Sequence, residues 1–189
     1  MTLSPILKKL LFVRQFGIDE GKINLLGDSE IMLNASALLE LQEIDSTKLY
    51  SLAKKSSFKN LGSFVEHAQV YDKVRDVFID NIKKLGDKIG ETSEGTIKTL
   101  QEIFNVYGLG EMYIQDIDNH NKEALVSIKN STIAEEWVKK YRKHSLMPTC
   151  TLTSGIIAGM FSYIFQKEVD CMEGKCKSMN SSYCVFKVA

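Results

Sequence analysis

Residues 173–186 read Glu-Gly-Lys-Cys-Lys-Ser-Met-Asn-Ser-Ser-Tyr-Cys-Val-Phe, so one glutamate precedes a cysteine by three residues and a second cysteine follows eight residues later. A third cysteine, Cys150, lies 23 residues before the glutamate. Zinc in proteins prefers a tetrahedron of thiolates and accepts a carboxylate as the fourth donor. The spacing is therefore consistent with a Cys₃Glu zinc site made by Cys150, Glu173, Cys176 and Cys184.

Other interpretations of these residues exist. Glu168-x-x-Cys171 repeats the three-residue spacing, but the residue eight positions after Cys171 is a methionine, which is a poor zinc ligand. This favours Cys171 as a spare thiol on the core side of a strand. His144 could replace Glu173 as the fourth ligand, although its place at the end of a basic helix favours solvent. Buried cysteines can also serve as small apolar residues, but all four lie in the last forty residues, which favours a metal.

The composition predicts a single globular domain with no net charge. With 189 residues, of which 44% are hydrophobic, the chain can bury one substantial core, and we expect a single domain over residues 1–189 with a metal-binding segment at 150–188. Twenty-four basic residues balance twenty-four acidic residues. This balance argues against direct binding of nucleic acid through bulk charge.

The first residues do not resemble an export signal. Lysines interrupt the apolar stretch between Leu3 and Val13, and the uninterrupted run after Lys9 is too short to span a membrane. We therefore expect a cytoplasmic protein with no membrane span. In that compartment thiols stay reduced, which favours metal ligation over disulfides.

The periodicity predicts an α/β (α+β) fold in which an antiparallel sheet packs against several helices. An N-terminal β-hairpin is expected at 22–26 and 30–33, joined by a loop at 27–29. Apolar residues at helical spacing follow, and the period changes to two after Gly110. The predicted helices are 36–44, 47–55, 64–85, 93–106, 132–143 and 152–165, and the later strands are 111–117, 123–129, 167–172 and 182–188.

The segment 173–186 resembles the closing motif of the 4-vinyl reductase domain family, and Cys150 with the Gly155 and Gly159 pair fits the same motif. The family glycine between the last two cysteines is Asn180 here, and asparagine tolerates positive φ better than other non-glycine residues. The resemblance implies that the chain is a stand-alone, archaeal-type member of this family, with a fold like that of the TRAPP vesicle-tethering subunits. It also implies that the chain is related to the sensory domains of phenol- and xylene-responsive transcription activators. In those domains three cysteines and a glutamate bind a structural zinc ion beside an apolar pocket.

The resemblance implies a zinc-stabilised sensor or carrier for a small apolar or aromatic molecule. The family includes a reductase of a vinyl-bearing tetrapyrrole, which is the first alternative, and a dimeric scaffold is the second. No catalytic triad, Walker loop or dinucleotide fingerprint emerges, which disfavours an enzyme. Trp137 could line the pocket or anchor a helix to the sheet. Residues suggested for the pocket share an aromatic side chain and are Phe64, Tyr71, Phe78, Trp137 and Tyr163.

Two further features concern partners. The basic run Lys139, Lys140, Arg142 and Lys143 could contact phosphate, but Glu135 and Glu136 precede it and favour a solvated helix face. The leucine-rich helices of the first hundred residues carry more apolar surface than a small sheet can cover. Because symmetric dimers are the commonest oligomers, we expect a homodimer through this region.

Overall fold

The computed structural model describes residues 33–68 and 108–189, together with 16–19, 22–25, 28–30, 100–101 and 104–105. Near the N-terminus, β1 (Phe16–Asp19), β2 (Lys22–Leu25) and β3 (Asp28–Glu30) form an antiparallel sheet in the order β1-β2-β3. The expected hairpin is present, but its predicted loop at 27–29 is wrong. Asp28 and Ser29 belong to β3 and pair with Leu25 and Asn24, so the connection between the two strands is one residue shorter than predicted.

Two helices follow. Helix α2 (Ala35–Ile44) begins where the Asn34 side chain accepts the N–H of Ala37 at 2.9 Å, a regular N-cap. Helix α3 (Ser46–Ala68) is continuous, whereas the sequence predicted a helix ending at Lys55 and another starting at Phe64. The single Gly62 does not break it, because one glycine costs a helix only about 1 kcal/mol. The predicted helix beyond Ala68 lies outside the described residues, and of 93–106 only Leu100, Gln101, Phe104 and Asn105 are described, all helical.

The C-terminal half contains a four-stranded sheet in the order β4-β5-β7-β6, with every neighbouring pair antiparallel. Its strands are β4 (Glu111–Asp118), β5 (Glu123–Lys129), β6 (Cys171–Lys175) and β7 (Cys184–Val188). The predicted alternation holds in β5, where Ala124, Val126 and Ile128 are buried. Strand β6 starts four residues later than predicted. Just before it, Glu168 and Asp170 pair with Lys54 through their side chains, and the backbone of Asp170 exchanges two hydrogen bonds with Ala189.

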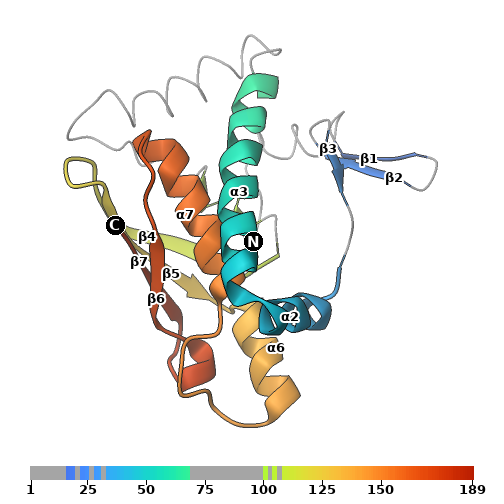
Figure 1. Cartoon of the computed structure of the whole chain (residues 1–189), viewed down its shortest axis with the longest axis vertical. Coiled ribbons are helices and arrows are strands. Elements are labelled where there is room, and N and C mark those ends of the chain that lie inside the picture. The colour runs from blue at the N-terminus through green and yellow to red at the C-terminus, as the bar shows by residue number, and fades with distance from the viewer. Residues whose placement is uncertain are drawn as a thin grey trace.

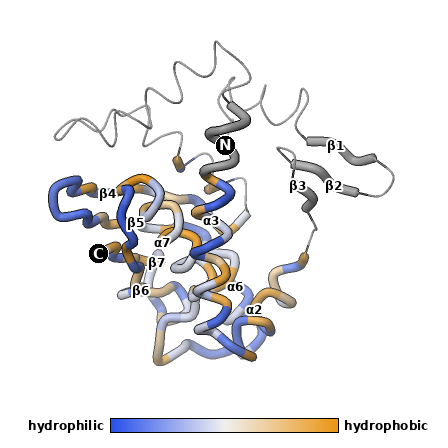
Figure 2. The backbone as a smooth tube through the Cα atoms, turned by 45° about the horizontal axis from the view of Figure 1, so that its top comes forward, coloured by the Kyte–Doolittle hydropathy of each residue, from blue (hydrophilic) through white to orange (hydrophobic). Residues whose placement is uncertain are grey.

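Helices α6 (Thr132–Tyr141) and α7 (Thr151–Phe165) complete the fold. Helix α7 lies between the sheet and α3, which runs alongside it (Figure 1). Most of α7 is buried, as expected for a helix that is apolar on nearly all sides. In Figure 2 the hydrophilic β4–β5 turn projects away from this core. The predicted α+β class, with an antiparallel sheet packed on helices, is confirmed.

Two glycines on α7 allow it to approach α3 closely. A Cβ atom added to Gly155 would lie 2.8 Å from the Cβ of Ala53, and one added to Gly159 would lie 2.9 Å from the backbone nitrogen of Phe58. Both distances are shorter than real Cβ contacts, so the helices touch through their backbones. Across the described part of the chain, no helix has the length and apolar character needed to cross a bilayer.

Candidate metal centre

Four potential metal donors converge at the end of the sheet nearest the start of α7. Cys150 precedes the first turn of α7, Glu173 lies in β6, Cys176 follows β6, and Cys184 opens β7. One ligand atom from each residue lies within 4.8 Å of every other, and all four residues are buried. The structure thus brings together the four residues that the sequence analysis selected.

The spacing of the three sulfur atoms fits a shared tetrahedral ion. The Sγ atoms of Cys150 and Cys176 are 3.7 Å apart, and Cys184 lies 3.6 Å from each of them. Zinc–sulfur bonds of about 2.3 Å at tetrahedral angles place two sulfurs about 3.8 Å apart. A disulfide needs about 2.05 Å, so these thiols are arranged as ligands and not as a bonded pair.

Glu173 has one carboxylate oxygen held and one available. Its Oε2 accepts the backbone N–H of Cys150 at 2.8 Å, which fixes the orientation of the carboxyl group. Its Oε1 is buried and lacks a hydrogen-bond partner within the described residues. A buried oxygen without a partner is costly, and ligation of a cation would satisfy it.

Protons and a cation would compete for the donors of this cluster. Burial, followed by the nearby Cys176, raises the pKa of Glu173 to about 8. Hydrogen bonds with the thiols of Cys150 and Cys184 hold the pKa of Cys176 well below its usual value. Without a cation, the raised pKa favours the neutral carboxyl group of Glu173, and the negative charge of the cluster lies mainly on Cys176. Among the described residues no lysine or arginine forms an ion pair with Glu173. A divalent cation would displace the protons of the donors and compensate the charge of the resulting thiolates and carboxylate.

Hydroxyl groups and one amide surround the sulfurs. Ser178 Oγ donates to Cys176 Sγ at 3.0 Å, and Thr149 Oγ1 lies 3.4 Å from the same sulfur. Ser131 Oγ is 3.3 Å from Cys150 Sγ, and the N–H of Lys177 donates to Cys184 Sγ at 3.3 Å. Such outer partners orient ligands. The sequence analysis missed these hydroxyls; closeness to a cysteine could have indicated Thr149 and Ser178, but nothing links Ser131 to the site before folding.

Gln42 on α2 also supports the site and was missed. Its Nε2 donates to the carbonyl oxygen of Thr149, and its Oε1 accepts the N–H of Leu152 at 3.1 Å. These bonds clamp the backbone on both sides of Cys150. A glutamine in the middle of a leucine-rich helix was the only sequence signal for this role.

The alternative ligands are placed elsewhere. Glu168 is exposed and pairs with Lys54 at 3.1 Å, and His144 is exposed in the loop after α6. Cys171 is buried in β6 but does not belong to the group of four. Asn180 has φ 68°, so the turn between Cys176 and Cys184 tolerates asparagine as expected.

The predicted aromatic pocket cannot be assembled from the described residues. The side chain of Phe64 and all of Tyr71 and Phe78 lie outside them. Trp137 and Tyr163 are half-buried on different helices, each beside its own aromatic neighbour. The Trp137 and Tyr141 rings are 4.8 Å apart, and the Tyr163 ring meets that of Phe58 edge-on at 5.6 Å.

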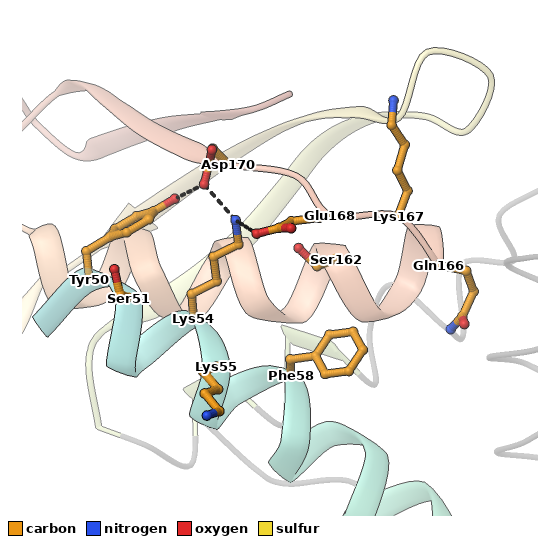
Figure 3. Close-up of a pocket in the computed structure, with 10 residues that line it drawn as sticks. All are labelled: Tyr50, Ser51, Lys54, Lys55, Phe58, Ser162, Gln166, Lys167, Glu168 and Asp170. Carbon is orange, nitrogen blue, oxygen red and sulfur yellow. Dashed lines mark hydrogen bonds and ion pairs between the residues drawn. The ribbon is translucent and has the colours of Figure 1, made fainter. Parts of the chain in front are cut away.

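A groove of about 650 Å³, lined mostly by polar and charged residues, lies between α3 and the segment that joins α7 to β6 (Figure 3). Lys54 Nζ crosses it to reach Asp170 at 2.7 Å, and the Tyr50 hydroxyl donates to the same carboxylate at 3.0 Å. The N–H of Cys171 in turn donates to the Tyr50 oxygen at 2.9 Å. These contacts attach the start of β6 to α3. The groove is therefore not the apolar pocket that the sequence analysis expected.

Comparison with known families concerns the segment that contains all four donors. Residues 126–189 match the 4-vinyl reductase domain. This segment begins within β5 and includes α6, α7, β6 and β7. The match confirms the resemblance inferred from the motif at 173–186, and the matched segment contributes every cysteine of the chain. No match is found among curated proteins.

One solved structure resembles this chain over its whole length. The phenol-responsive sensory domain of the transcription activator PoxR, crystallised with phenol, has a TM-score of 0.68 at 15% identity, covering 100% of this chain and 90% of that one. At this identity the likeness shows the fold alone.

Two further structures have a TM-score of 0.46 each. A vinyl-4-reductase family protein from Methanocaldococcus jannaschii is 16% identical, covering 87% of this chain and 85% of that one. A trafficking protein particle complex subunit 3 from Naegleria fowleri, covalently bound to palmitic acid, is 13% identical, covering 83% and 82%.

Proposed function

We propose that the chain is a single domain, stabilised by a structural zinc ion, that binds a small apolar or aromatic molecule as a sensor or carrier. The observation that carries the proposal is the buried Cys₃Glu cluster at tetrahedral spacing inside the segment that matches the 4-vinyl reductase domain. Cys150, Glu173, Cys176 and Cys184 would bind the ion. The fold shared with the phenol-responsive sensory domain of PoxR supports the small-molecule part.

The chemistry of the donors supports zinc in a structural role. Three thiols and one carboxylate supply all four positions of a tetrahedron, which leaves no open position for a substrate. Such an ion would tie the first turn of α7 to the β6–β7 connection. This closed arrangement favours a sensor or carrier over a reductase of a vinyl-bearing tetrapyrrole.

The ligand would be buried between the sheet and residues 64–85, which lie mostly outside the described part of the chain. Within the described part α7 fills the space between the sheet and α3, and Trp137 and Tyr163 are the two candidate lining residues whose side chains are described. A modest volume, on the order of 300 Å³, suffices for a single-ring or short-chain molecule. The four free cysteines suit a reducing compartment, which supports the cytoplasm. Homodimer formation through the first hundred residues would provide a route by which ligand binding is communicated.

Two measurements test the proposal. Native mass spectrometry of protein purified without added metal should show one zinc per chain together with any retained ligand. A thermal-shift screen with phenols, alkylbenzenes, fatty acids and porphyrins should raise the melting temperature, since a ligand at about a hundred times its Kd stabilises the native state by roughly 2.7 kcal/mol. Absence of zinc contradicts the metal part, and absence of any shift leaves the dimeric scaffold as the better interpretation.

A further inference from the structure

The loop between α6 and α7 displays two adjacent apolar side chains to solvent. Leu146 is 96% exposed and is the most exposed large hydrophobic side chain of the described residues, and Met147 is 73% exposed. The loop lies at the lower end of the molecule in the view of Figure 1, beyond the end of α6. Burial elsewhere would stabilise both side chains, so their exposure needs an explanation.

Hydrogen bonds hold this loop in a conformation that points its tip toward solvent. The N–H of Ser145 donates to the carbonyl oxygen of Ser178 at 2.8 Å, which attaches the loop to the turn between β6 and β7. The hydroxyl of Ser145 donates to the carbonyl oxygen of Met147 at 2.6 Å and accepts the N–H of Met147 at 3.1 Å. The turn therefore holds Leu146 and Met147 at its tip, away from the core.

Unpaired cations stand at the base of the same loop. Lys139 pairs with Glu136 at 3.3 Å and Lys140 with Glu43 at 2.9 Å, so these two charges are neutralised locally. Arg142 and Lys143 are exposed, and neither has a carboxylate partner within the part of the chain that the structure describes. Within six residues, two cations without a carboxylate partner in the described part of the chain thus precede two protruding apolar side chains.

We propose that this loop docks the protein on the surface of a bilayer that contains anionic lipids. Leu146 and Met147 would enter the boundary between headgroups and acyl chains, and Arg142 and Lys143 would contact lipid phosphates. A protruding tip needs no preformed cavity in a bilayer, whereas a protein partner would need a matching acidic pocket. Because the net charge of the chain is zero, the attraction is local to the loop.

Binding of this kind is weak and reversible. One apolar tip and two cations fall short of the two strong signals that stable anchoring requires. Each cation contributes about a fivefold increase in partitioning onto an anionic surface, and that contribution falls when salt shortens the Debye length from about 10 Å to about 3 Å. This docking is independent of the proposed ligand pocket.

Vesicle flotation with the full chain tests the proposal. The protein should float with vesicles of phosphatidylcholine mixed with phosphatidylserine and remain behind with phosphatidylcholine alone. The double variant Leu146→Ser with Met147→Ser should weaken partitioning by at least about tenfold, as expected for losing two buried apolar side chains. Arg142→Gln with Lys143→Gln should weaken it about twentyfold and remove most of the salt dependence.

Matched controls distinguish binding through the loop from nonspecific adsorption of the protein to vesicles. Met172 is 74% exposed on β6, so Met172→Ser removes an equally exposed methionine and should leave partitioning unchanged. Lys129→Gln removes the charge of an exposed lysine at the end of β5 and should also leave partitioning nearly unchanged. Circular dichroism and metal content confirm that each variant is folded. Failure of the parent protein to bind anionic vesicles, or equal losses in Met172→Ser and the loop variant, overturns the proposal.

Discussion

A methyl group on Gly155 would lie 2.5 Å from the carbonyl oxygen of Tyr50. Because that oxygen belongs to the backbone of α3, it cannot move aside as a flexible side chain would. The same relationship recurs one turn later, where the Cβ position of Gly159 meets the carbonyl oxygen of Lys54. The two helices are therefore packed at a distance that any side chain at these positions would increase.

Gly155→Ala should destabilise the domain by about 1–3 kcal/mol, because the added carbon forces α7 away from α3. Gly159→Ala should cost at least as much. Gly174→Ala is the matched control, since a Cβ there meets nothing within 4 Å. Urea unfolding of the three variants measures the difference. Equal stability of all three would mean that the helices can separate without penalty.

Cys176→Ser should abolish stoichiometric zinc binding and lower the melting temperature of protein prepared with zinc, because a closed structural site contributes its binding free energy to folding. Cys171→Ser should keep the zinc and cost about 1–2 kcal/mol from placing a hydroxyl in an apolar environment. Elemental analysis and thermal unfolding distinguish the two. Loss of zinc in both variants would argue against the assignment of Cys171 as the spare thiol.

Gln42→Leu should destabilise the protein by about 2–4 kcal/mol, since the buried carbonyl of Thr149 and the partly buried N–H of Leu152 lose their partners. Zinc affinity should also fall, because the backbone that positions Cys150 loosens. Gln166→Leu removes an exposed glutamine and should change stability by no more than about 0.5 kcal/mol. Chemical denaturation and competition with a chelator measure both effects.

The Asp170 carboxylate predicts a specific acid dependence. The hydrogen bond from Lys54 holds the pKa of Asp170 below its ordinary value of 3.8. A lowered native pKa means that the pair stabilises the fold above the unfolded pKa and loses this contribution as pH falls through the native pKa. Asp170→Asn should therefore be less stable at pH 7, by at most about 1 kcal/mol because the carboxylate is largely exposed.

In urea titrations at several pH values, the difference between Asp170→Asn and the parent should shrink as the solution is acidified below the unfolded pKa. A difference that stays constant down to the lowest pH would show that packing and not charge sets the effect. Comparing variant with parent at each pH cancels the general acid loss of any bound metal.

Ile44→Asp and Leu52→Asp should shift the protein from dimer to monomer. These side chains are 80% and 62% exposed at the end of α2 and on α3, in the region proposed for self-association. Met172→Asp, on β6, should leave the oligomeric state unchanged. Sedimentation equilibrium decides the question, and a parent protein that is monomeric at every concentration would refute the dimer.

The sequence predicted the features that depend on local patterns. Alternation of apolar residues identified β5 with correct ends, and the spacing of Glu173, Cys176 and Cys184 identified the group that the structure brings together. Period and spacing are short-range properties, so they can be recognised without knowledge of the fold. The left-handed backbone of Asn180 was expected because the resemblance to the 4-vinyl reductase domain family implies a glycine at this position.

Features that depend on distant contacts could not be predicted. The side chain of Asp170, just before β6, pairs with Lys54, which is 116 positions away. The clamp from Gln42 reaches Thr149 over 107 positions. No spacing rule connects such residues, because the folded chain alone brings them together.

The close contact of α3 with α7 has a kinetic consequence. Tyr50 and Gly155 are more than a hundred residues apart, and the chain between them must close as a loop before the glycines can meet the backbone of α3. The β4–β5 and β6–β7 hairpins close over far fewer residues and can form first. Arrival of α3 on α7 is then the late step, so a substitution at Gly155 should accelerate unfolding while leaving the folding rate nearly unchanged.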